Sequence, residues 1–406
     1  MIDDSPLTIE EVFDAYFDCR KHKRNTLNQL RFEADLERNL VELYHDLTAG
    51  RYKISPSIAF VVLHPKIREI WAAGFRDRVV HHIIYNRISG HFYRRFIRDT
   101  YACIPGRGMH DGKRRVSSFA RSITRNWTRP AYYLKVDIAN FFNSIDRHVL
   151  LGILEQHPTA PWLGALIRQV TLHDPNPGAE FRSRPALFDM VPPHKSLRRA
   201  PEGKGLPIGN LTSQFFANVY LNELDQFVKH RLRAEYYGRY VDDMILFHED
   251  AGVLNSWCEQ INDFLRDRLA LRLHPNKKHL NRIDAGFDFT GFIIKPGRTY
   301  LRQTSVARCK SRIRRWEKAG RPLDGATLNK LTASVNSYLG MLRQVDGYKA
   351  RRAICRRVEN LFIVSDPACT KVQSRVGTTS KEQPMGNRTS ASQRRKRRRD
   401  DRDRLQ

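Results

Sequence analysis

The order of apolar and polar residues predicts that this chain mixes β-strands with α-helices. Residues 236–247 form two apolar, β-prone runs that meet at the adjacent carboxylates of Asp242 and Asp243, which predicts a β-hairpin with an acidic turn. Upstream, a second strand-like run over residues 133–137 ends at Asp137, and a turn then leads into an aromatic pair. Both patterns place carboxylates at the end of a predicted strand.

In other segments the spacing of apolar residues is typical of helices. Residues 205–214 are interrupted by Gly and Pro, and the apolar residues Phe215, Val219 and Leu224 that follow predict a long helix. A further hairpin and two amphipathic helices rich in Arg and Lys are predicted at residues 287–294, 306–319 and 328–358.

The pattern ends near residue 362. The remainder is polar, contains Gly, Ser and Thr, and carries six consecutive basic residues at 394–399. Such a segment buries too little apolar surface to fold, so we expect residues 363–406 to be a disordered basic tail. The tail either adds electrostatic affinity for RNA or is a passive solvated segment.

Charge and composition point to a polyanionic partner. The formal net charge is +28 and the sequence pI is about 10.2, so nucleic acid is the natural ligand, with an anionic membrane surface or an acidic protein as alternatives. No apolar run is long enough to span a bilayer, and the acidic start is unlike a signal peptide. The six scattered cysteines form no Cys-x-x-Cys pair, which predicts reduced thiols in a cytoplasmic protein.

Adjacent aspartates at a half-buried turn repel each other unless a cation neutralises them. An acidic hairpin tip in solvent is the simpler interpretation of Asp242 and Asp243 alone. A strand-end carboxylate at Asp137, brought beside them, would instead build a site for two divalent ions. A site of that kind catalyses in-line phosphoryl transfer.

With Asp137 in a strand-end motif and Tyr240-Val241-Asp242-Asp243 in a hairpin, the sequence resembles the reverse transcriptases. The resemblance implies two Mg²⁺ ions, with Mn²⁺ as an alternative, bridged by Asp137 and Asp242. Asp243 would assist, and the carbonyl of Ile138 would be a further ligand.

The resemblance also implies roles for residues around the carboxylates. Phe142 would pack on the sugar and exclude a 2′-hydroxyl, while Lys66 and Arg68 would hold the incoming triphosphate, unless they belong to an ordinary solvated face. Lys277 would protonate the departing pyrophosphate, and the adjacent Lys278 competes for that role.

Residues 205–214 narrow the resemblance to the enzymes of diversity-generating retroelements, which are bacterial or phage-encoded. Most reverse transcriptases have glutamine where this chain has Ile208, and they end the motif differently from Ser213-Gln214. Gly209 and its neighbours would let the backbone approach the nucleotide and the templating base, with Gln214 close by. Isoleucine has no hydrogen-bonding group, so we expect weaker selection of the correct nucleotide, unless Ile208 only packs.

The resemblance implies an α+β right-hand polymerase fold. We expect N-terminal helices and fingers at 1–125, a palm with the acidic hairpin in an antiparallel sheet at 126–295, a short helical thumb at 296–362 and the tail at 363–406. Implied partners are template RNA, the cDNA/RNA duplex, dNTPs and a small basic accessory protein, with no membrane.

The implied activity is RNA-directed DNA polymerisation that makes error-prone cDNA from a structured template RNA, for adenine-directed mutagenic retrohoming. A reverse transcriptase of a bacterial anti-phage defence system is the alternative within the same superfamily. A catalytically inactive RNA-binding scaffold is the alternative from a different class, and the intact trio of Asp137, Asp242 and Asp243 argues against it.

Overall fold

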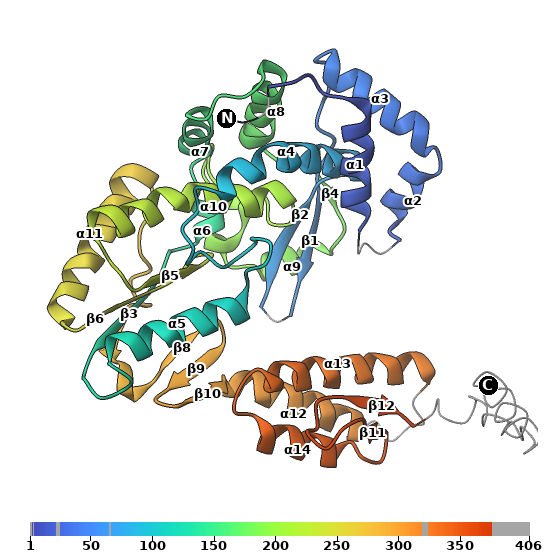
Figure 1. Ribbon diagram of the computed structural model, residues 1–406. Helices are drawn as coiled ribbons and strands as arrows, with labels where there is room; N and C mark the ends of the chain where they lie inside the picture. Colours follow the sequence, from blue (N-terminus) through green and yellow to red (C-terminus); the bar gives the residue numbers. More distant parts are fainter. Residues whose placement is uncertain (1, 3, 22–24, 65, 319–323, 376–406) are drawn as a thin grey trace, which may run out of the picture. The chain divides into compact units, whose positions relative to one another are not determined.

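The computed structural model describes residues 2, 4–21, 25–64, 66–318 and 324–375 (Figure 1). The chain divides into two compact units, of which the first ends at Thr299 and the second begins at Tyr300. The predicted mixture of helices and sheets is confirmed. None of the described helices is long and apolar enough to span a lipid bilayer.

A four-stranded sheet with the order β5-β6-β3-β7 forms the centre of the first unit, and each neighbouring pair is antiparallel. The predicted acidic hairpin is confirmed, since its two strands are joined by a turn at Val241 and Asp242. The strands in chain order are β3 (Tyr132–Asp137), β5 (Tyr237–Tyr240), β6 (Asp243–His248) and β7 (His279–Arg282).

Side chains alternate across this sheet, and each face has its own core. Leu134 and Val136 belong to a large core with α10 (Leu211–Gln226) and α11 (Ala251–Leu269). The opposite face carries Tyr133, which belongs to a smaller core. That core contains residues of α5 (Met109–Ile123) and of the hairpin formed by β8 (Phe287–Phe289) and β9 (Phe292–Lys295).

A second sheet is built on the antiparallel hairpin of β1 (Ile58–Val62) and β2 (Arg68–Ala72), with the short β4 (Glu180–Phe181) parallel to β1. In Figure 1 this hairpin extends from the blue end of the first unit, near the N-terminal helices. Those helices are α1 (Ile9–Arg20), α2 (Leu27–Glu33), α3 (Leu36–Thr48) and α4 (Phe75–Tyr93), and α1 packs on α4.

Shorter elements connect these layers. The helices are α6 (Phe141–Ser144), α7 (Arg147–Glu155), α8 (Pro161–Leu172) and α9 (Pro185–Asp189). Single turns of 3-10 helix occupy Pro193–Lys195, Leu197–Arg199 and Ile283–Ala285, and a π-helical turn occupies Phe227–Arg231.

The second unit consists of three helices and a small hairpin. Strand β10 (Arg298–Leu301) spans the division between the units. It is followed by α12 (Gln303–Lys318), α13 (Gly325–Arg343) and α14 (Tyr348–Arg357), so the helix predicted over 328–358 is broken before Gly347.

The prediction of disorder from residue 363 is wrong for its first thirteen positions. β11 (Phe362–Val364) pairs with β12 (Val372–Ser374), and the side chains of Phe362 and Val372 are fully buried. Asn336 on α13 hydrogen-bonds both the carbonyl and the N–H of Val372, at 2.9 and 2.8 Å. This long-range pairing satisfies the backbone of a segment whose composition is polar. The rest of the predicted tail lies outside the described residues.

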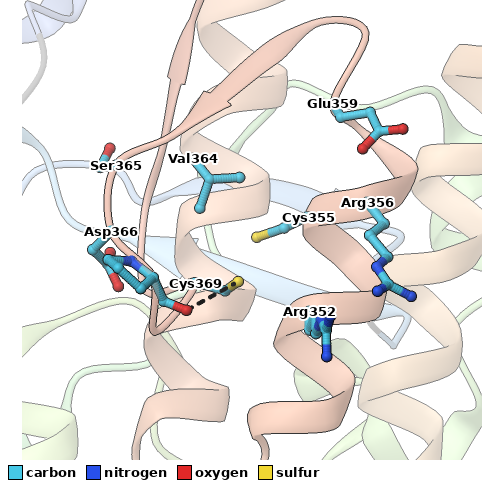
Figure 2. Close-up of a pocket in the computed structure, with 9 residues that line it drawn as sticks. Arg352, Cys355, Arg356, Glu359, Val364, Ser365, Asp366 and Cys369 are labelled. Atoms are coloured by element: carbon cyan, nitrogen blue, oxygen red, sulfur yellow. Dashed lines mark hydrogen bonds between the residues drawn. The ribbon is translucent and has the colours of Figure 1, made fainter.

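A cavity of about 470 Å³ lies in the second unit beside the β11–β12 connection (Figure 2). Cys355 and Cys369 both line it, and the Cys369 thiol donates to the Pro367 carbonyl at 3.8 Å. All six cysteines are free thiols. Burial raises the pKa of Cys355 to about 12, so this thiol stays protonated at neutral pH and is a poor nucleophile.

Candidate active site

The turn of the β5–β6 hairpin presents the acidic pair. Val241 has a φ of +56°, a left-handed conformation that is costly for a β-branched residue. The guanidinium of Arg239 donates to the Val241 carbonyl at 2.9 Å and so stabilises the turn. Asp242 therefore lies at the tip, and Asp243 begins β6.

Asp137 is the last residue of β3 and is paired directly with Asp243 in the sheet register. Directly opposed residues point to the same face of a sheet, with Cβ atoms about 4.5–5.5 Å apart. The carbonyl of Asp137 accepts from the N–H of His274 at 2.7 Å, and the next residue, Ile138, bridges to Leu273. The second hydrogen bond of this bridge runs from the Ala139 N–H to the Arg272 carbonyl. The Ile138 carbonyl takes part in neither of the two bonds.

We call Asp137, Asp242 and Asp243 the acidic cluster, and the charges of Asp137 and Asp243 destabilise the ionised form of Asp242. Burial, with the charge of Asp137 next, raises the pKa of Asp242 to about 6. Burial also raises the pKa of Asp243, although the ammonium of Lys135 opposes that shift. Accumulated negative charge of this kind is stabilised by cations.

Two lysines provide positive charge at the carboxylates. Lys277 Nζ lies 2.9 Å from Asp137 Oδ1, whereas Lys278 Nζ donates to Asn255 on α11 at 2.8 Å. The structure therefore separates the two neighbours that the sequence left in competition. Of these two neighbours, Lys277 is the one that contacts Asp137.

Lys135 is the second lysine, and the sequence reasoning missed it. Its Nζ lies 3.2 Å from Asp243 Oδ2 and 3.8 Å from Asp288 Oδ1. The signal was present in the strand period, since Lys135 precedes Asp137 by two positions and therefore shares its face. Asp288 could not be found this way because it belongs to β8, far along the chain.

The cluster offers oxygen donors of the kind that Mg²⁺ prefers. Within the part of the chain that the structure describes, no group of three or more His, Cys, Asp or Glu side chains is arranged to hold a metal ion. Lys277 and Lys135 instead contact oxygens of Asp137 and Asp243. The chemistry of this donor set suits a hard divalent cation, and the two ammonium groups neutralise part of its negative charge.

A buried ion pair stabilises the β5–β6 hairpin, and the sequence did not lead us to predict it. Arg239 and Asp225 are both fully buried, and the guanidinium makes bonds of 2.8 and 2.6 Å to the carboxylate. Thr100 and Tyr237 each donate a hydroxyl to Asp225 at 2.7 Å. An arginine inside an otherwise buried strand was the available signal, because such a charge requires a partner.

The residues predicted to bind triphosphate belong to the second sheet. Lys66 is exposed in the β1–β2 connection, and Arg68 is exposed at the start of β2. The carboxylates lie on the central sheet, so these two basic residues belong to a different sheet of the same unit.

The segment around Ile208 contacts β2 closely. The Trp71 N–H donates to the Ile208 carbonyl at 2.8 Å, and the side chain of Ile208 is half-buried. Gly209 has a φ of +144°, and a Cβ there would lie 2.8 Å from the Trp71 carbonyl, so only glycine fits. Gln214 is exposed, and its amide oxygen accepts from the Cys103 thiol at 3.4 Å.

Phe142 connects this segment to the strand-end motif. The Phe142 carbonyl accepts from the Leu206 N–H at 2.8 Å, and Gly205 donates to Ile145 at 2.8 Å. The ring of Phe142 is half-buried, with its centroid 5.3 Å from that of Phe141. The candidate sugar gate therefore adjoins residues 205–206.

Comparisons with known proteins agree with this arrangement. The family model described as "Reverse transcriptase (RNA-dependent DNA polymerase)" matches residues 64–294, which is more than half of the chain and contains every candidate site residue. The chain is also similar to protein YkfC of Escherichia coli (strain K12), with 21% identity over 300 residues that cover 65% of this chain and 73% of the relative.

Proposed function

Because the chain belongs to the reverse transcriptase family and is an RNA-directed DNA polymerase, we propose that it makes error-prone cDNA in a diversity-generating retroelement. Its substrates are template RNA and dNTPs, and the chemistry is nucleotidyl transfer. The product would be cDNA copied from a structured template RNA, with changes concentrated at template adenines and used for mutagenic retrohoming.

The acidic cluster would perform the transfer. Asp137, Asp242 and the Ile138 carbonyl would hold two Mg²⁺ ions, or Mn²⁺, with Asp243 assisting. When bound, these ions supply charge neutralisation at the reacting phosphate and a lowered pKa for the primer 3′-hydroxyl. Lys277 would leave Asp137 Oδ1 and donate a proton from Nζ to the departing pyrophosphate.

The surrounding residues would select the nucleotide. Arg68 and Lys66 would bind the triphosphate, and the fork of Arg68 matches phosphate oxygens. Phe142 would exclude a 2′-hydroxyl by packing on the sugar. Gly209 would bring the backbone close to the nascent pair, with Gln214 near it.

The observation that carries the error-prone assignment is the environment of Ile208. Its backbone carbonyl is already bonded to Trp71, and its side chain has no donor or acceptor. A side chain of this kind gives no hydrogen bond that a correct pair would form better than a wrong one. Discrimination is a difference between such contacts, so it falls when they are missing.

The domain assignment follows the family's architecture. We assign residues 1–125 to N-terminal helices and fingers, 126–295 to the palm and the following helices to the thumb. The ordered thumb would extend to residue 375, since β12 ends at Ser374. A small basic accessory protein would be the protein partner, in the cytoplasm of a bacterial host.

Ile208→Gln tests the proposal. We expect fewer misincorporations, above all opposite adenine, with a modest loss of rate because an unpaired buried amide costs about 1–3 kcal/mol. The measurement is sequencing of cDNA made by the parent and the variant on a template that contains all four bases.

Ile208→Leu is the matched control, since it changes the shape but adds no amide, and its error spectrum should equal that of the parent. An unchanged spectrum in Ile208→Gln would show that Ile208 only packs. An accurate parent enzyme would contradict the retroelement assignment and favour a role in anti-phage defence.

A further inference from the structure

A buried carboxylate that the proposed mechanism does not use lies on β2. Glu69 is only 3% exposed, yet its carboxylate accepts three hydrogen bonds. The donors are the Ser196 hydroxyl at 2.6 Å, the Leu197 N–H at 2.9 Å and the Trp71 indole at 3.2 Å. These three bonds compensate the cost of burying the charge.

The same strand is bonded again to the chain that follows Leu197. The Trp71 N–H donates to the Ile208 carbonyl at 2.8 Å, and the Ala73 N–H donates to the Asn210 side chain at 2.9 Å. Residues 196–210 therefore contact β2 first at Glu69 and again at Trp71, and they also contact Ala73, which follows the strand. We call residues 196–210 the clamp segment.

The clamp segment also contacts the turn that holds the candidate sugar gate, through the bond between Leu206 and Phe142. The position of β2 is thereby coupled to the position of Phe142.

Side chains alternate between the two faces of β2, so Glu69 and Arg68 lie on opposite faces. Glu69 and Trp71 are buried, whereas Arg68 is exposed and Ile70 is half-buried. Ile70 and Gly209 both line a cavity of about 190 Å³, and a Cβ on Gly209 would lie 3.1 Å from Ile70 Cγ2. The face of β2 opposite Glu69 thus carries Arg68 and meets the Ile208–Gly209 peptide.

We propose that Glu69 is a positioning residue for dNTP selection, because its carboxylate holds the clamp segment and so sets the distance between the strand of Arg68 and the Ile208–Gly209 peptide. This inference rests on the proposed roles of Arg68 and Ile208 at the nucleotide. Glu69 acts through these residues and does not contact the nucleotide itself.

Glu69→Gln tests this role in the full-length enzyme, with an RNA template, a DNA primer and Mg²⁺. The amide has nearly the same shape and keeps one acceptor oxygen, but its NH₂ group replaces the other, so the charge is lost and the three donors cannot all keep their present bonds. We expect KM for the dNTP to rise about tenfold, because the substrate is positioned less well. The value of kcat should change by less than about threefold, because Asp137, Asp242 and Asp243 are unchanged.

Glu180→Gln is the matched control. Glu180 lies on β4 of the same sheet, is exposed and is paired with Arg182, so its replacement should leave KM unchanged. Ser196→Ala removes one of the three donors and keeps the charge, so it should raise KM in the same direction by a smaller factor. If Glu69→Gln does not fold, as judged by circular dichroism, Ser196→Ala decides the matter.

Values of KM within about twofold of the parent for the folded variants would overturn the inference. A fall in kcat without a rise in KM would overturn it as well, because that result indicates damage to the chemical step. The ratio of KM between variant and parent can be measured on any template and does not depend on the error rate. A parent enzyme that copies its template accurately would therefore contradict only the retroelement proposal.

Discussion

At the scale of single residues, Asp242 shows how burial changes the titration of a carboxyl group. Its carboxyl is held in a half-buried turn beside Asp137, and the pKa of about 6 places its titration near neutral pH. The same burial that destabilises its charge makes it a strong site for a cation. Lys277 forms an ion pair with Asp137, and Lys135 forms one with Asp243.

Replacing Asp242 with Asn should reduce Mg²⁺-dependent incorporation by about 10³-fold or more, because several kcal/mol of transition-state stabilisation would be lost. RNA binding should persist, since it depends on the basic surface. Primer extension and filter binding measure the two properties. Asp267→Asn, at an exposed position on α11, is the control, and near-parental extension by Asp242→Asn would remove the metal-site assignment.

The raised pKa also predicts how stability depends on pH. A carboxyl whose folded pKa exceeds the unfolded value near 3.8 binds more protons in the folded state between pH 4 and pH 6. In EDTA, the contribution of Asp242 to the free energy of unfolding should therefore fall as pH rises from 4 to 6, by up to about 3 kcal/mol, and stay constant above that.

Denaturant unfolding of the parent and Asp242→Asn at several pH values isolates this contribution. The stability of the variant relative to the parent should rise as pH increases from 4 to 6. Because a bound ion requires the ionised carboxylate, the affinity for Mg²⁺ should weaken below about pH 6. A pH-independent difference between the two proteins would contradict the burial of this carboxyl.

At the scale of elements, the β5–β6 hairpin depends on a charge network beneath it. Arg239 joins β5 to Asp225 on α10 and to the Val241 turn, so one guanidinium links a strand, a helix and the acidic tip of the hairpin. Both partners of the pair are fully buried, and each is costly without the other. The network is thus a support for the turn more than a source of net stability.

Arg239→Met should destabilise the fold by about 3–5 kcal/mol, because Asp225 would remain buried without its cation. Arg239→Met combined with Asp225→Leu should recover part of that loss. Arg266→Met, which removes the exposed ion pairs with Asp263 and Asp267 on α11, is the control and should change the stability far less. Chemical denaturation measures all three, and a loss of under about 1 kcal/mol for Arg239→Met would show that the pair is dispensable.

At the scale of the whole molecule, charge is the dominant property. From an excess of 28 positive charges over 406 residues we expect affinity for nucleic acid of any sequence, and we expect that affinity to depend on salt. The basic run at residues 394–399 follows Arg375, the last residue that the structure describes, so it can be removed without changing any described helix or strand.

Truncation after Arg375 should weaken RNA binding and flatten its salt dependence, with the logarithmic slope falling by about 0.7–0.9 for each phosphate group that the tail neutralises in the parent. The rate of incorporation at saturating RNA should not change. Binding isotherms at several salt concentrations measure the slope. Replacing residues 394–399 with serine is the control for chain length, and an unchanged slope in both proteins would show a passive tail.

The sequence by itself determined the local parts of this protein. Apolar, β-prone runs predicted the strand that ends at Asp137 and the hairpin that presents Asp242 and Asp243, because strand propensity and turns depend on neighbouring residues. The approach of the Gly209 backbone to the nucleotide stays a prediction, and the close approach that the structure shows is to the Trp71 carbonyl. The composition predicted a nucleic-acid partner.

Only the tertiary structure decided which distant residues meet. The choice of Lys277 over Lys278, the pairing of Arg239 with Asp225, the contact of Glu69 with Ser196 and the anchoring of β12 by Asn336 all join separate elements. No local period encodes these contacts, since each is set by how helices and sheets pack and by the need to satisfy buried polar groups. For that reason the acidic motifs could be read from the chain, whereas the network that holds them could not.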